Sequence, residues 1–323
     1  MIFIEASDNL RLRPSHLLLM IYRYMSGVYQ AGDLSALSYT KGYLDASSGS
    51  SESKRVLTVS GHGIGEAESW LADHIADCQI DAVSFRLVDT QLLQFLRAAE
   101  PHHIESVLDQ FKEMVAPFPV LAELMADPGL TPYWCEQSKA LKRLADEERM
   151  SIFGVHPEKI PAQRLYDLIY VSHGEPFLTR DSVVKLREHL APDGNMAVLV
   201  RTQPNGSGSG TRTEPFAGST PVLNAIRYFD SYIEERGYSV AATPKPAVDL
   251  ADIARVEEPI NFSVLAPADS VLIGELILTS LPDHIPDQAR LEALDEAASR
   301  FTGLQAPVSE SLKLYLLGTT GAK

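Results

Sequence analysis

Apolar positions along the chain fall into short continuous runs, separated by stretches in which they recur every three or four residues. The run at 56–59 is typical of a strand buried on both faces, and apolar residues at four-residue spacing over 67–75 predict a helix packed on it. A second strand-like run covers 82–88, and a third covers 166–172. Strands that alternate with helices predict βα units and a parallel sheet.

The remainder of the chain adds helices and later strands. Thr179 can cap a helix that runs through Leu190, Pro192-Asp193-Gly194 predicts a turn, and 133–150 is polar and helix-forming. Further helices are expected at 104–114, at 220–237 and after Pro286, and further strands at 196–200, 238–242, 275–281 and 312–317. Because strands that pair late in a chain often close such sheets, we expect an antiparallel C-terminal edge.

The first 54 residues are expected to form a helical cap and hinge ahead of a main domain at 55–323. Residues 15–29 are apolar on more than one face, which is too much for a surface helix. We interpret them as a helix packed on the main domain, and the alternative is a lid over a ligand pocket. The polar run at 46–53 predicts the flexible hinge.

Three alternating glycines follow the first strand, in the stretch R-V-L-T-V-S-G-H-G-I-G-E. Gly61, Gly63 and Gly65 let the backbone turn sharply and approach a ligand closely, because no Cβ stands in the way. A dinucleotide fingerprint needs its third glycine at position 66, which is Glu66, so the fit to NAD or FAD is poor. The alternative is a tight turn that binds nothing.

Polar side chains follow the next two strand-like runs. Asp89 follows 82–88, where it can accept a hydrogen bond from a ribose hydroxyl or, alternatively, cap the next helix. Ser172, His173 and Glu175 stand at the end of the third run. Ligands of open α/β sheets sit beyond the carboxyl ends of the strands. We therefore expect these residues at the same rim as the glycines.

These motifs together resemble class I S-adenosylmethionine (SAM) methyltransferases over about 53–202. The likeness rests on G-H-G-I-G-E, on V-D-T-Q-L-L-Q, and on D-L-I-Y-V-S-H followed by a helix and L-A-P-D-G-N-M-A-V-L-V. Within that family the chain looks most like histamine N-methyltransferase-like enzymes, on the Gly-Glu that ends the glycine loop and on Asp89 with Gln94. The resemblance implies a doubly wound, mostly parallel, seven-stranded Rossmann-like sheet with helices on both faces and an antiparallel C-terminal edge.

The resemblance also implies roles for single residues. Gly61, Gly63, Gly65, Asp89, Gln94 and Ser172 would bind SAM. His173 would remove a proton from the acceptor, because histidine is the usual proton acceptor near neutral pH, and the alternative is a histidine that is only hydrogen-bonded at a strand end. Glu175 would instead pair with a cationic amine. Two features depart from the family: Asp89 is shorter than the usual Glu, and the segment Ser60-Gly61-His62 crowds the loop.

Composition and charge narrow the classes of partner, bound metal and cellular location that we expect. A net charge of −15 and an isoelectric point near 5.0 argue against nucleic acid as a partner. Cys78 and Cys135 stand far apart, so we expect neither a disulfide framework nor a metal site. With no signal peptide or membrane span expected, the prediction is a cytoplasmic protein that acts on a small molecule. The oligomeric state stays open, a homodimer included.

The sequence therefore predicts SAM-dependent methyl transfer to a nitrogen or oxygen of a small-molecule acceptor, with specialised metabolism as one setting. Two alternatives stay open, since a fold does not guarantee a reaction. The protein can bind SAM and catalyse a cyclisation or rearrangement without methylation, or it can be a non-catalytic partner subunit. The Gly/Ser-rich segment 205–211 is expected to be a disordered loop or a gate over the acceptor.

Overall fold

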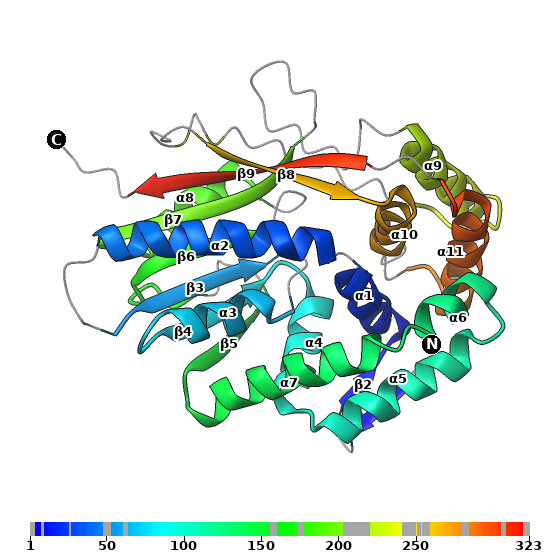
Figure 1. The fold of residues 1–323 in the computed structure, drawn as a ribbon, viewed down its shortest axis with the longest axis horizontal. Coiled ribbons are helices and arrows are strands. Elements are labelled where there is room, and N and C mark those ends of the chain that lie inside the picture. Colours follow the sequence, from blue (N-terminus) through cyan, green and yellow to red (C-terminus); the bar gives the residue numbers. More distant parts are fainter. Residues whose placement is uncertain are drawn as a thin grey trace.

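A computed structural model describes residues 4–7, 10–25, 27–47, 53–60, 64–155, 160–173, 178–202, 220–240, 250, 253, 259–279, 284–304 and 308–318. Its large sheet contains β3 (Arg55–Ser60), β4 (Gln79–Ser84), β5 (Met150–Val155), β6 (Tyr166–Ser172), β7 (Leu190–Thr202), β8 (Ile260–Ala266) and β9 (Val308–Gly318). The strand order is β5-β4-β3-β6-β7-β9-β8 (Figure 1). The first five of these are parallel neighbours, and β9 runs antiparallel between β7 and β8. The predicted fold class is confirmed.

Helices surround this sheet, and a small antiparallel hairpin of β1 (Ile4–Ser7) and β2 (Leu10–Leu12) stands apart from it. The helices are α1 (Pro14–Met25), α2 (Gly27–Ser47), α3 (Glu66–His74), α4 (Leu87–Ala98), α5 (Pro101–Val115), α6 (Pro119–Met125), α7 (Leu130–Asp146), α8 (Arg180–Glu188), α9 (Thr220–Glu234), α10 (Ala268–Thr279) and α11 (Asp287–Phe301). Figure 1 shows α9, α10 and α11 grouped at one end of the molecule. No helix in the described ranges is long and apolar enough to cross a membrane.

Alternate residues of each central strand enter two different cores. In β6, Leu168 and Tyr170 join the large core formed with α1 to α7 and α9 to α11, whereas Ile169 and Val171 join a smaller core under α8. All four side chains are buried, because a parallel strand covered by helices on both faces has no solvent side. Helices therefore pack on both faces of the sheet, as expected.

Several predicted elements are confirmed. The first strand, the helix that Glu66 begins, and the strand at 166–172 appear as β3, α3 and β6. Thr179 caps α8 as predicted, because its hydroxyl accepts a hydrogen bond from the backbone N–H of Ser182. The segment at 15–29 packs on the main domain, with α1 almost entirely buried, but it forms two helices and not one. Residues 46 and 47 of the expected hinge belong to α2, and 48–52 lie outside the described residues.

Three predicted strands are wrong in part or whole. The run at 275–281 was expected to be a strand, yet its described residues lie in α10, where consecutive residues are buried and leave no periodicity to distinguish helix from strand. The run at 82–88 stops being a strand at Ser84, because Leu87 already begins α4. Residues 238–240 form no regular element, and 241–242 lie outside the described residues.

The remaining differences between prediction and structure concern the strands β5, β7 and β8. Leu190 and the expected turn at Pro192-Asp193-Gly194 lie within β7, where the pairing register with β6 shifts. The stretch 133–150 is mostly helical, as predicted, because α7 runs to Asp146, but the sheet-edge strand β5, which begins at Met150, was not predicted. β8, at the opposite edge of the sheet, was not predicted, although its burial alternates along the strand.

Candidate functional site

The sheet reverses its winding between β3 and β6. From β3 the chain moves outward through β4 to β5, whereas β6 leads to β7 on the other side. Ser60 and Ser172, the last residues of β3 and β6, are direct partners in the register. Open α/β sheets bind ligands at such a switch point, outside the carboxyl ends of the strands. The residues that follow Ser60 and Ser172 therefore define the candidate site.

Gly65 closes the turn that leads from β3 into α3. Its φ of 108° lies in the left-handed region, and a Cβ there would lie 2.5 Å from a methyl carbon of Leu141. Both the backbone conformation and the packing against α7 thus require glycine at this position. Gly61, His62 and Gly63 lie outside the described residues, so their predicted contacts with a cofactor stay predictions.

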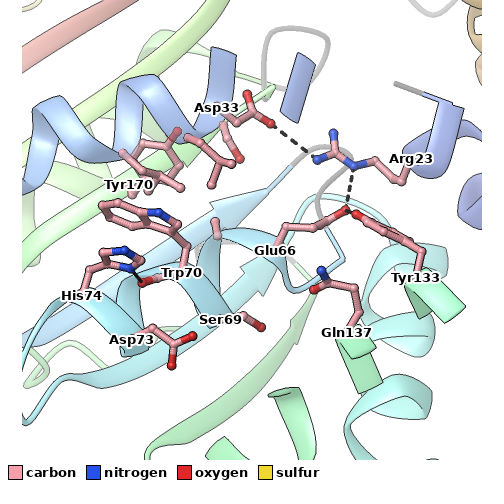
Figure 2. A pocket seen from close by; sticks show the side chains of 14 residues that line it. Arg23, Asp33, Glu66, Ser69, Trp70, Asp73, His74, Tyr133, Gln137 and Tyr170 are labelled. Carbon is pink, nitrogen blue, oxygen red and sulfur yellow. Dashed lines mark hydrogen bonds and ion pairs between the residues drawn. The ribbon is translucent and has the colours of Figure 1, made fainter. Parts of the chain in front are cut away.

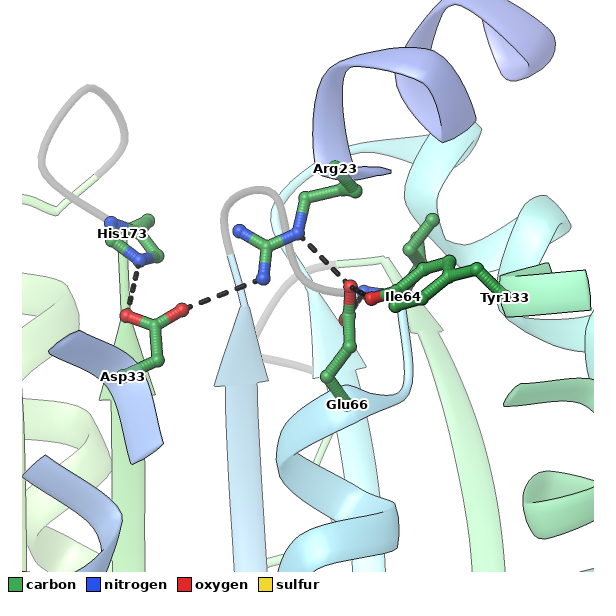
Figure 3. A network of polar contacts seen from close by, with 6 residues as sticks. All are labelled: Arg23, Asp33, Ile64, Glu66, Tyr133 and His173. Atoms are coloured by element: carbon green, nitrogen blue, oxygen red, sulfur yellow. Dashed lines mark hydrogen bonds and ion pairs between the residues drawn. The ribbon is translucent and has the colours of Figure 1, made fainter. Parts of the chain in front are cut away.

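Five polar side chains from five different elements form a chain of contacts at this rim (Figure 3). His173 Nε2 lies 2.7 Å from Asp33 Oδ1 of α2, and Asp33 Oδ2 accepts a hydrogen bond of 3.4 Å from Arg23 at the end of α1. Arg23 Nε also donates to Glu66 Oε1 at 3.1 Å. The Tyr133 hydroxyl of α7 donates to the same Glu66 oxygen at 3.4 Å. The network therefore joins the end of β6 to the start of α3.

Within this network, opposite charges favour the ionised forms of Asp33 and Arg23. Burial alone would raise the pKa of Asp33, but His173 and Arg23 outweigh it and the net pKa is lowered. Burial also opposes a charged Arg23, yet Glu66 and Asp33 raise its pKa above the usual value. Glu66 has one more partner, the backbone N–H of Ile64, which donates to Oε2 at 2.9 Å. Each carboxylate thus lies between at least two donors.

A cavity of about 230 Å³ opens beside this network (Figure 2). Tyr170 and Trp70 lie on the α2 side of α3, and Ser69 and Gln137 lie on its α7 side. The Tyr170 hydroxyl, Ser69 Oγ and Gln137 Oε1 are buried and make no hydrogen bond with the residues that the structure describes. Buried polar atoms without a partner are rare in folded proteins, so a ligand or water is expected to satisfy these three. The lining consists of Arg23, Asp33, Leu34, Leu37, Glu66, Ala67, Ser69, Trp70, Asp73, His74, Tyr133, Gln137, Tyr170 and Ser172.

The charge of the lining favours a cationic or zwitterionic ligand. The lining contains one guanidinium, Arg23, and three carboxylates, Asp33, Glu66 and Asp73, of which Asp73 also pairs with Arg143 outside the lining. The Trp70 ring stacks on His74 with centroids 4.1 Å apart, and aromatic faces attract cations. An anionic ligand would face net repulsion here. Among the described residues, no group of three or more His, Cys, Asp and Glu side chains could hold a metal ion.

The predicted site residues separate into three groups. Ser172 lines the cavity, and His173 is buried at the end of β6 in contact with Asp33. Glu175 lies outside the described residues. Asp89 and Gln94 lie on α4 and do not line the cavity.

The expected position of Asp89 at the end of a strand is wrong, and so is its alternative as a helix cap. Arg86 occupies the cap position, and Asp89 lies in the first turn of α4 with its side chain 1% exposed. Arg86 donates to both carboxylate oxygens, at 2.5 and 2.8 Å, and Ser84 Oγ donates at 2.9 Å. Burial raises the pKa of Asp89, partly opposed by Arg86. Each carboxylate oxygen therefore already has a donor.

Sequence reasoning missed Arg23, Asp33 and Tyr170. Arg23 did carry a signal, because a single charged residue inside an apolar helix needs a buried partner. The sequence around Asp33 contains no comparable signal, because Asp33 lies 140 residues before the histidine that it contacts.

No family model and no curated protein matches the chain. Solved structures with a related chain path include a candidate sarcosine dimethylglycine methyltransferase from Galdieria sulphuraria, at 12% identity over 88% of this chain and 83% of that one, with a TM-score of 0.39. A SAM-dependent methyltransferase from Thiobacillus denitrificans, in complex with S-adenosyl-L-homocysteine, gives 13% identity over 88% and 90%, with a TM-score of 0.37. Geranyl diphosphate C-methyltransferase from Streptomyces coelicolor A3(2) gives 9% over 87% and 76%, with a TM-score of 0.36. At these values the likeness carries no weight for function, which has to be argued from the strand order and the side chains.

Proposed function

We propose that the protein is an enzyme that transfers a methyl group from SAM to a nitrogen or oxygen of a small molecule. The observation that carries this proposal is the pairing of Ser60 with Ser172 at the switch point, which brings the ends of β3 and β6, followed by Gly65 and His173, to the same rim of the sheet. The sequence motifs that resemble class I methyltransferases belong to these same two strand ends. The antiparallel β9 between β7 and β8 agrees with the fold that the resemblance implies.

The charged groups of the cavity fit one end of SAM. SAM carries a sulfonium, an ammonium and a carboxylate group, and the lining offers one cation and an excess of carboxylates. Arg23 would hold the carboxylate and Glu66 the ammonium. The cavity of about 230 Å³ is smaller than the roughly 300–1,000 Å³ of common ligand sites. It therefore suits the amino-acid end of SAM and not the whole molecule.

Asp89 does not fit a ribose contact as it stands. A ribose hydroxyl would have to displace Arg86 or Ser84 from the carboxylate, or share an oxygen with them. The finer likeness to histamine N-methyltransferase-like enzymes remains part of the proposal, but it loses support here because Gln94 lies exposed on α4. The occupied carboxylate of Asp89 also favours a second candidate function, that of a methyltransferase-fold protein that acts as a non-catalytic partner subunit.

Methyl transfer from a sulfonium is a displacement, so the protein mainly supplies proximity and a dry pocket. His173 would remove the proton of an amine or hydroxyl acceptor, since it is buried at the rim where β6 ends. Glu175 would instead attract an ammonium group of the acceptor.

Calorimetric titration with SAM and with S-adenosylhomocysteine tests the proposal. We expect wild type and His173→Ala to bind SAM alike, and the variant to lower kcat by roughly 10²–10⁴-fold. Turnover would be followed as S-adenosylhomocysteine release with a panel of amines and phenols. If Glu175 is the main acceptor contact, its substitution raises KM more than it lowers kcat. A wild-type protein that binds neither ligand refutes the proposal, and one that binds SAM tightly but methylates nothing favours the alternatives.

A further inference from the structure

His173 has a backbone conformation that needs outside support. Its φ of 51° lies in the left-handed region, which is unfavourable for a residue with a Cβ. The backbone N–H of His173 donates to Leu199 O at 3.3 Å, which ties it to β7. The imidazole is anchored separately, by Asp33 at 2.7 Å. Residues held in such strained conformations cluster at functional sites.

The contact with Asp33 selects one form of the imidazole. The net pKa of Asp33 is lowered, so near neutral pH the carboxylate is ionised and can only accept hydrogen bonds. His173 Nε2 must then carry the proton that it shares with Asp33 Oδ1. In a neutral imidazole this leaves the lone pair on Nδ1, the atom that would receive a proton.

Arg23 fixes the carboxylate from its other side. Asp33 contacts His173 through Oδ1 and Arg23 through Oδ2. These two contacts together fix the orientation of the carboxylate group. Among the described residues, the other titratable groups near this set include Glu66 and Tyr133, which lie beyond Arg23, and Tyr170 of β6, whose pKa burial raises well above the usual value. None of these is placed to replace Asp33 at Nε2, because each contacts another part of the network or faces the cavity.

We infer that Asp33 is a positioning residue that holds His173 in a single tautomer and orientation for proton transfer. The catalytic role of His173 rests on the proposed function, whereas the tautomer and the orientation do not. Helix α2, from the segment expected to form a helical cap and hinge, would thus complete the site. The arrangement follows the general logic in which a third group orients the base.

Nitrogen-15 NMR of protein labelled at its nine histidines tests the inference without any methyl transfer. The His173 signals are identified as those absent from His173→Ala. We expect wild type to show one neutral tautomer protonated at Nε2, and Asp33→Ala to show a mixture of both. Asp33→Asn keeps an acceptor oxygen at the same place, so it should largely restore the wild-type form. Asp45→Ala is the matched control, because Asp45 lies on the same helix in an exposed pair with Lys41.

A His173 tautomer that is the same in wild type and Asp33→Ala overturns the inference. If Asp33→Ala does not fold, wild type and Asp33→Asn are measured instead. A single Nδ1-protonated form of His173 in wild type then refutes the inference. These outcomes do not depend on the proposed function, whose failure would appear separately as absent SAM binding.

Kinetics supplies a second readout. Asp33→Ala should lower kcat by about 10- to 10³-fold, which is no more than the loss expected from removing His173 itself. Because both residues act as one unit, His173→Ala with Asp33→Ala should be no slower than His173→Ala alone. Fully additive losses would show that Asp33 acts independently of His173 and would overturn the inference.

Discussion

Replacing Arg23 by Met tests whether the buried ion network stabilises the fold. The Arg23 side chain is 3% exposed, and its partners Asp33 and Glu66 are each 14% exposed. Met keeps much of the apolar length of the side chain but removes the guanidinium from between two carboxylates. Breaking a buried ion pair by removing one partner typically costs about 3–5 kcal/mol, because the remaining charge is left in a poorly solvated place.

This loss can be converted into a melting temperature. An unfolding entropy of about 2.1 cal/mol/K per residue gives roughly 0.7 kcal/mol/K for 323 residues. A cost of about 3–5 kcal/mol then lowers Tm by roughly 4–7 °C, measurable by differential scanning calorimetry. The Arg143–Asp73 pair offers a matched control, since both side chains are 49% exposed. Arg143→Met should lower Tm by less than about 1.5 °C, because exposed pairs contribute only about 0–1 kcal/mol. Equal shifts in the two variants would refute the reasoning.

Three further predictions concern α2, α3 and the turn that precedes α3. Gly65→Ala should destabilise the protein by about 1–3 kcal/mol, from the left-handed backbone and the contact with Leu141. Gly42→Ala should stabilise it by roughly 0.5–1 kcal/mol, because Gly42 lies in α2 with nothing within 4 Å of the added Cβ. Urea titration measures both, and a stabilising Gly65→Ala would contradict the account of the turn. Burial raises the pKa of Glu68, partly opposed by the Thr58 hydroxyl at 2.5 Å. The folded state therefore favours the protonated form, and its stability falls as the pH rises through and above the ordinary range of a glutamate carboxyl. Glu68→Gln should thus raise Tm relative to wild type at pH 8 but not at pH 4, and a pH-independent difference would refute this.

The sequence predicted what is encoded within a few neighbouring residues. β3, Gly65 and α3 follow one another directly, and each has its own local pattern of apolar run, glycine and four-residue spacing. The contact between Asp33 and His173 could not be read in this way, because it joins two segments that only the folded sheet brings together. Local patterns place the ends of strands but do not show which helix covers them.

The misassigned strand at α10 has a different cause. Leu272, Leu276 and Ile277 are fully buried between α1, α9 and α11, so no solvent-facing side interrupts the apolar run. A helix buried on all sides and a central strand look alike in sequence. The true sixth strand, β8, lies at the edge of the sheet and exposes Leu265 at 66%. Complete burial therefore gave α10 the apolar run that is expected of a central strand, whereas the edge strand β8 has no such run.

The insertion of β9 between β7 and β8 has a consequence for how the chain is made. β8 pairs with β9 and not with β7, so β8 cannot join the sheet until residues 308–318 have left the ribosome. Until then β7 presents an open edge and β8 has no partner strand in the sheet, and unpaired edges are templates for aggregation. Nascent or truncated chains that stop before residue 308 are therefore expected to depend on chaperones, even though β3, β4 and β6 are already complete.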